Sequence, residues 1–518
     1  MASFLVVYML DLAHAKNPGL SFWHAFTHIS PQDASNVMGG VGEVIAAILG
    51  IVITVASIIV QLAATRYTPR ITHMFFRDRT NILVMAFFVV SAVFALWTNF
   101  VIREDGANGS KAAFVPYYGI LITMGFLTLS LLIMVPYFAY VFDFLEPDKI
   151  VARIKSIGIG HALQSPRAES EEELDHRRMS AFASLEQLAD IALNAIEQKD
   201  KGLASSTIDS IADLVVAYLK AKPKLDARWF EIRGHLLADA DFVSMNPDSL
   251  QKLGATKTWF EYKALRQYLM VYREALSEIP DIVNRIAIDS RYLGHAAIAA
   301  EDREALDVVM KFLNTFMRRA LNAKDVAAAY NNLNQYRLLA EELIKADWSE
   351  EVLRIAGYFK YYAQTAQAMK LAFITETAAF DLCALNELAY ESKSSARDKL
   401  LLVFLDVDKE AEAKSQESSL RGVRKAQAKL AAYYLQKDEK QLARRIYRDM
   451  RDEKPERLAS IRDEMLSVTT NEFWEVNDRG GVFEYIDPDR RAFVHIFFEW
   501  FPNIAPPKLL MSDDTNSF

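Results

Sequence analysis

The 518-residue sequence contains a single cysteine, Cys383, so no intrachain disulfide can form. Its first 144 residues are poor in charge, with seven Lys or Arg and seven Asp or Glu and therefore no net charge. The remaining 374 residues carry 112 charged side chains and a net charge of −8. This contrast excludes a free-standing soluble enzyme and also a transporter with most of its mass in the bilayer. It predicts a membrane anchor joined to a large water-exposed domain.

Several functional signatures are also missing from the sequence. The large domain has no excess of Lys and Arg, which excludes phosphate-backbone binding and hence a nucleic-acid partner. The sequence contains no phosphate-binding Gly-Lys-Ser/Thr loop, no His-Glu-x-x-His and no serine elbow. The hydrophobic runs carry no acidic or basic side chain at mid-membrane, which disfavours proton-coupled transport. We therefore expect a protein that is not an enzyme and uses no cofactor.

Three charge-free runs predict transmembrane helices at about residues 44–64, 82–102 and 112–142. Each run has the roughly 20 residues that a helix needs to cross a hydrocarbon core of about 30 Å. These helices define a predicted transmembrane domain at residues 41–144, which follows an extracytoplasmic segment at residues 1–40. The predicted anchor therefore has three helices.

The loop between the first two runs contains four arginines against one acid, Asp78: Arg66, Arg70, Arg77 and Arg79. The next loop has equal numbers of basic and acidic side chains. Because arginine-rich loops stay in the cytoplasm, we expect this loop and residues 145–518 to be cytoplasmic and the N-terminus to lie outside. The four arginines are candidates for contact with anionic lipid headgroups or another anion. Asp78 can pair with a basic neighbour.

Small residues recur every four positions at Gly42, Ala46, Gly50 and Thr54, a series that begins just before the first run and continues into it. This spacing places them on one helix face, which another helix can approach closely. We expect this face to support helix packing, and the protein to be a homo-oligomer.

His24 and His28 have the i, i+4 spacing used by two-ligand metal sites. No third ligand stands at a defined spacing, and the aromatic residues Phe22, Trp23 and Phe26 are interleaved with the two histidines. This pattern favours an interfacial amphipathic helix over a metal site. The two histidines remain weak metal candidates.

Two short sequences carry a resemblance to a known family: QLAATRYTPR at residues 61–70 and FFRDR at residues 75–79. Together they resemble the signature of the predicted bacterial membrane proteins grouped as domain of unknown function 2254. The resemblance covers roughly residues 38–153. It implies a bacterial inner-membrane protein with a cytoplasmic C-terminal region and assigns no chemistry. This chain lacks a further N-terminal transmembrane helix, so a four-helix topology is not implied.

After residue 144 the sequence predicts helix after helix, because apolar residues repeat with helical spacing and no alternating strand pattern persists. The hairpin that begins at Gln427 and ends at Pro455 has tetratricopeptide-like spacing, although no second copy occurs at a 34-residue offset. The prediction divides this part into a connecting region (residues 145–180) and a cytoplasmic helical array (residues 181–405). A linker (residues 406–419), a C-terminal hairpin region (residues 420–501) and an irregular tail (residues 502–518) follow.

The predicted fold class is therefore an all-α membrane protein with a three-helix anchor and a large helical cytoplasmic domain. Stacked helical hairpins suit extended protein surfaces, which predicts a scaffold that binds cytoplasmic protein partners at the inner membrane. The alternative is an oligomeric channel that favours anions, because three helices alone cannot enclose a wide aqueous path. Such a channel needs a polar strip, for which Ser91, Thr98 and Asn99 are the candidates.

Overall fold

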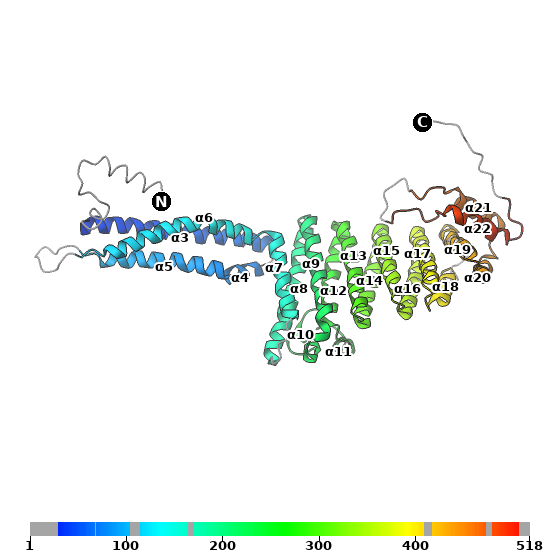
Figure 1. Cartoon of the computed structure of the whole chain (residues 1–518), viewed down its shortest axis with the longest axis horizontal. Helices are drawn as coiled ribbons and strands as arrows, with labels where there is room; N and C mark the ends of the chain where they lie inside the picture. Colours follow the sequence, from blue (N-terminus) through cyan, green and yellow to red (C-terminus); the bar gives the residue numbers. More distant parts are fainter. Residues whose placement is uncertain are drawn as a thin grey trace, which may run out of the picture. The chain divides into compact units, whose positions relative to one another are not determined.

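The computed structural model describes residues 29–67, 69–103, 114–163, 170–408, 417–472 and 479–506. These ranges are mostly helical and contain no strand beyond one isolated antiparallel bridge, between Arg103 and Phe114. The predicted all-α fold class is confirmed. The chain divides into two compact units, residues 1–153 and residues 154–518, which are described separately below (Figure 1).

Between residues 29 and 144, the described part of unit 1 contains three long helices and one short one: α3 (Pro31–Arg66), α4 (Arg70–Phe76), α5 (Arg79–Val101) and α6 (Tyr117–Phe144). The three long helices pack against one another, as Figure 1 shows. Val41 and Ile45 of α3 meet Ala95 of α5 in one buried cluster, and Ala34 and Met38 meet Ile120 of α6 in another. Most of the remaining apolar side chains of these helices are exposed, as expected for helices that face lipid.

The first helix begins well before the predicted residue 44. The Ser30 side chain caps it by accepting a hydrogen bond from the Asp33 amide (3.1 Å), and Pro31 occupies the first helical position. The added turns contain polar residues, which a search for charge-free apolar runs leaves out. Residues 31–40 of the predicted extracytoplasmic segment are therefore helical, whereas α5 and α6 begin and end within about five residues of their predicted bounds.

Four described helical stretches are long and apolar enough to cross a membrane, one more than the sequence predicted. Three are α3, α5 and α6, whose most apolar windows are 17–28% buried. The fourth is Lys201–Lys224, whose window is 61% buried because neighbouring helices of unit 2 cover it. Its apolar composition is therefore explained by protein packing.

Unit 2 is a stack of helices in two layers (Figure 1). In the first layer each helix packs on the next in the order α9 (Lys201–Ala221), α13 (Pro280–Ala299), α15 (Val326–Lys345), α17 (Ala372–Glu391) and α19 (Glu417–Gln436). The second layer runs α8 (Glu171–Glu197), α12 (Trp259–Glu278), α14 (Arg303–Ala323), α16 (Ser349–Ala368) and α18 (Arg397–Leu405).

Shorter elements interrupt or end this stack. The 3-10 turns η1 (Lys222–Lys224) and η2 (Ala227–Phe230) and the helices α10 (His235–Ala238) and α11 (Pro247–Ala255) lie between α9 and α12. The stack is followed by α20 (Lys440–Met450), α21 (Pro455–Ser467) and α22 (Pro488–Glu499). Helix α7 (Pro147–Leu163) contains the boundary between the two units.

The turns between helices of the stack share one backbone conformation. Five residues with a left-handed conformation follow at intervals of 23 residues: Glu301, Lys324, Asp347, Lys370 and Lys393. At each, the amide of the next residue donates to the carbonyl five residues before it, for example Asp325 N to Ala320 O (3.0 Å), as in a Schellman motif. The array therefore repeats every 23 residues per helix. This period does not support the tetratricopeptide-like reading, although the predicted hairpin exists as α19 and α20.

Candidate functional site

The arginine-rich loop is a short helix between two caps. Pro69 precedes α4, which runs to Phe76, and Asp78 then caps α5 by accepting a hydrogen bond from the Thr80 amide (2.9 Å). Residues 69–78 of this connection are therefore a short helix followed by the cap of α5.

Asp78 is the centre of the polar contacts in this loop. The Tyr140 hydroxyl donates to its carboxylate at 2.5 Å, and the Arg153 guanidinium lies 3.5 Å away. Partial burial opposes ionisation, but the hydrogen bonds from Tyr140 and Thr80 and the charge of Arg153 outweigh it and lower the pKa of Asp78. The prediction that Asp78 pairs with a basic neighbour is wrong in its partner, because the paired arginine is Arg153.

Three further contacts stabilise the same end of unit 1. Asn81, on the first turn of α5, accepts a hydrogen bond from the Tyr137 hydroxyl (2.8 Å) and donates to the Phe75 carbonyl (3.3 Å). The Arg153 guanidinium also lies over the Phe144 ring at 4.0 Å. The loop, the start of α5 and the end of α6 are therefore joined by polar contacts.

The four predicted arginines have different surroundings. Arg66 lies over the Tyr67 ring at 5.4 Å, and Arg70 is the first residue of α4, with its side chain outside the described part. Arg77 and Arg79 are exposed and form no ion pair with any described residue. These two guanidinium groups are the ones available to an anion or a lipid headgroup.

The predicted small-residue face lies mainly outside the packing of the three helices. Only Gly42 approaches another helix, with its Cβ position 4.0 Å from the Ala95 side chain. Ala46 and Gly50 are exposed, and nothing lies within 4 Å of a Cβ placed on Gly50. These two positions are open to a further helix.

The candidate polar strip of a channel lies inside one copy of unit 1. Ser91 and Thr98 are buried and donate to the carbonyls of Phe87 (2.7 Å) and Phe94 (2.9 Å) in their own helix. Asn99 accepts a hydrogen bond from Ser35 of α3 at 3.3 Å. The strip is therefore occupied by contacts within the chain.

His24 and His28 lie outside the described residues. Among the described ranges no group of three or more His, Cys, Asp or Glu side chains could hold a metal ion. Cys383 is buried in α17, where burial raises the pKa of its thiol.

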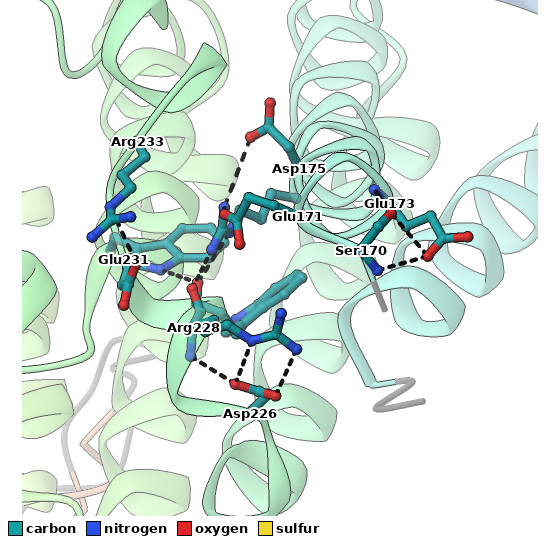
Figure 2. Close-up of polar contacts among 11 residues, drawn as sticks. Ser170, Glu171, Glu173, Asp175, Asp226, Arg228, Glu231 and Arg233 are labelled. Carbon is teal, nitrogen blue, oxygen red and sulfur yellow. Dashed lines mark hydrogen bonds and ion pairs between the residues drawn. The ribbon is translucent and has the colours of Figure 1, made fainter. Parts of the chain in front are cut away.

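A buried arginine at the start of unit 2 was not singled out from the sequence. Arg178 of α8 is fully buried and donates to the carbonyls of Arg228 and Trp229, while Glu171 and Asp175 lie 3.2 and 3.8 Å from it. Figure 2 shows Glu171 and Asp175 next to each other, with the capping box between Ser170 and Glu173 apart from them. These contacts fasten η2 to α8, which is a structural role. No sequence motif marks such an arginine.

Comparison with known proteins bears on the first part of the chain. Residues 1–203 match the model of a family described as a predicted membrane protein, DUF2254. The resemblance carried by residues 61–70 and 75–79 is thereby confirmed. The DUF2254 match contains all of unit 1 and also α8, and together with the apolar helices it describes a helical membrane protein.

The other comparisons add little to the DUF2254 match. No curated protein matches the chain. A solved structure described as a circular tandem repeat protein with novel repeat topology and enhanced subunit contact surfaces is similar to 70% of this chain and 90% of its own, at 16% identity and a TM-score of 0.29.

Proposed function

We propose that this membrane protein is a non-enzymatic scaffold, in which unit 1 is the anchor and unit 2 binds protein partners. The observation that carries the proposal is the two-layer stack, because a repeated helix–turn unit presents a long continuous surface. Apolar side chains lie exposed on its first layer, and Tyr292 of α13 and Phe373 of α17 are each 47% exposed. Exposed aromatic side chains are frequent anchors of protein interfaces.

Site-specific photo-crosslinking in cells tests this proposal. A photoreactive phenylalanine at position 292 or 373 should give an adduct with a discrete partner, whereas the same residue at Leu402 of the second layer, 50% exposed, should not. Tyr292→Ser with Phe373→Ser should lower recovery of that partner, and Leu402→Ser should not. Equal recovery from both variants, or no adduct at either first-layer position, contradicts the proposal.

The proposed location is the bacterial inner membrane, with the N-terminus outside and unit 2 in the cytoplasm. The support is the arginine content of the loop that contains the exposed Arg77 and Arg79. In a Cys383→Ala background, an impermeant thiol reagent applied to intact cells should label Arg103→Cys and spare His73→Cys. Preferential labelling at position 73 reverses the orientation.

An anion channel is the second candidate, and the exposed arginines are the observation that favours it. Arg77 and Arg79 would concentrate anions at the inner mouth of an oligomeric pore. The burial of Ser91 and Thr98 within one copy weighs against it, because these side chains are then unavailable to line a pore between copies.

A further inference from the structure

A cavity of about 300 Å³ lies in the C-terminal part of unit 2. Its walls come from α15, α17 and α19 and from residues 479–483, a segment named here the strap. Helix α17 contributes Asp381, Cys383 and Glu387, of which Cys383 and Glu387 are four residues apart on one helix face. The other charged side chains of the described lining are Arg337 of α15, Lys429 of α19 and Arg479 of the strap.

The strap is attached to all three helices. Phe483 stacks on Phe380 of α17 with ring centroids 5.1 Å apart and an interplanar angle of 6°. Arg479 pairs with Asp381 and also donates to the Tyr330 carbonyl of α15 at 2.9 Å. The Lys429 ammonium donates to the Phe483 carbonyl at 2.8 Å. The cavity wall is therefore fixed in place by contacts from each side.

Glycine gives the strap its close fit. Gly480 has a φ of +73°, a conformation that glycine adopts most readily. A Cβ on Gly481 would lie 2.5 Å from the Asn471 side chain, so a larger residue could not occupy this position without displacement. The backbone at these two residues can therefore line the cavity directly.

The basic side chains of α19 differ in the number of carboxylates that lie close to them. Arg424 has carboxylates of Asp408, Asp449 and Glu453 within 2.9 Å. Lys425 likewise faces three carboxylates, from Glu376, Glu464 and Glu484, at 3.7, 2.5 and 3.1 Å. Lys429, one turn further along and at the cavity, has no carboxylate within 4 Å among the described residues, and its hydrogen bond there is to a neutral carbonyl.

The two acids of the cavity are already paired with arginines. Asp381 contacts Arg479 and lies 3.3 Å from Arg337. Glu387 lies 2.9 Å from Arg490 of α22. Among the described lining residues, the Lys429 ammonium therefore has no carboxylate within 4 Å, and the charge of Glu387 acts on it only at longer range.

We propose that this cavity binds a small organic acid, whose carboxylate pairs with the Lys429 ammonium. A carboxylate would give the lysine the charge-assisted hydrogen bond that Arg424 and Lys425 obtain from the protein itself. The volume limits the ligand to a small molecule and excludes a folded partner. This proposal is independent of the scaffold function and does not require it.

Calorimetric titration of the detergent-solubilised full chain tests the assignment. The probes are acetate, succinate, benzoate and glutamate, with chloride at matched ionic strength and inorganic phosphate as a separate arm. At least one carboxylate should bind saturably, and Lys429→Met should weaken it by about tenfold or more. Lys429→Arg should retain binding. The matched control is Lys440→Met, which removes an exposed lysine at the start of α20 and should leave binding unchanged.

A second measurement locates the ligand. Cys383 is buried, so Cys383→Ala with Ala384→Cys moves the only cysteine of the chain to a half-buried position of the same lining, where methylthiolation by a small thiol reagent gives a single mass change. The bound acid should slow this reaction in that protein and in its Lys440→Met form, and should not slow it in its Lys429→Met form. Binding of phosphate alone, no saturable binding by any of the four acids, or binding unaffected by Lys429→Met overturns the proposal.

Discussion

At the scale of single residues, Asp78 connects the arginine-rich loop to the rest of unit 1. It caps α5, accepts a hydrogen bond from Tyr140 of α6 and pairs with Arg153 of α7. Because these three partners come from separate parts of the chain, one carboxylate fixes the loop against two other helices. Exposed Arg77 and Arg79, by contrast, have no such structural task among the described residues.

We expect Asp78→Ala to lower the free energy of unfolding of the detergent-solubilised chain by about 2 kcal/mol, because it removes the cap and two charge-assisted contacts. Asp78→Asn keeps a good helix cap and should cost about half as much. Asp143→Asn is the control, because Asp143 is 61% exposed and pairs only with exposed partners such as Lys149. Thermal unfolding checks these values, and equal losses for Asp143→Asn and Asp78→Ala would contradict the assigned role.

Asp289 makes the stability of unit 2 depend on pH. Burial raises its pKa to about 7 and the nearby Asp209 carboxylate adds to this, while Arg285 at 3.5 Å opposes it. The pKa of Asp289 in the folded protein therefore lies above its value of about 3.9 in the unfolded chain. The contribution of Asp289 to the free energy of unfolding is fully present below about pH 4 and is lost as the pH rises through 7.

Asp289→Asn should therefore raise the melting temperature at pH 8 and change it little at pH 4.5, because the amide stays uncharged. Asp281→Asn, an exposed acid of the same helix, should show no such pH-dependent difference. Melting curves of the three proteins at both pH values provide the measurement. A shift of the same size at pH 4.5 and pH 8 rules out titration of Asp289 as the cause.

At the scale of helices, the turns of the stack explain what sequence reading found and missed. Helical periodicity was enough to predict the α-helices of unit 2, and the charge-free runs were enough to predict the three long helices of unit 1. The repeat was missed because its left-handed turn positions carry Lys, Asp or Glu, whereas glycine is the usual marker of such a turn. The pairing of Asp78 with Arg153 was also missed, because the two residues are distant in sequence and only the packed helices bring them together.

The same turns predict opposite effects of glycine at two nearby positions. Lys324 has a φ of +55°, which costs a non-glycine residue free energy, so Lys324→Gly should raise stability by about 0.5 kcal/mol. Arg319→Gly, in the regular part of the same helix α14, should lower it by about 1 kcal/mol. Thermal unfolding of both variants is the check, and loss of stability in Lys324→Gly would contradict this account of the turns.

The small-residue face of α3 gives a second prediction for a helix. Gly50→Leu should weaken the proposed oligomer, because Gly50 is exposed in one copy and offers close approach to another. Gly125→Leu on α6 is the control, since its Cβ position is equally open but carries no small-residue repeat. Native mass spectrometry in mild detergent distinguishes the two. A monomeric wild type, or equal dissociation of both variants, excludes this interface.

At the scale of the whole molecule, the two units have different surfaces. Unit 1 exposes apolar side chains along three long helices, while unit 2 buries its apolar residues between two layers. The charge contrast in the sequence was enough to predict this division, because lipid and water select opposite side chains for an exposed surface. The proposed partner surface and the cavity proposed to bind an organic acid depend on contacts between distant helices, which composition does not encode.

The central claim is that unit 1 anchors the protein without conducting ions and that unit 2 carries the function. Anion efflux from liposomes that contain the purified full-length protein tests it most directly. We predict efflux equal to that of protein-free liposomes, for the wild type and for Arg77→Ala with Arg79→Ala alike. Reproducible anion efflux from the wild type that this double substitution abolishes would contradict the scaffold and establish the channel.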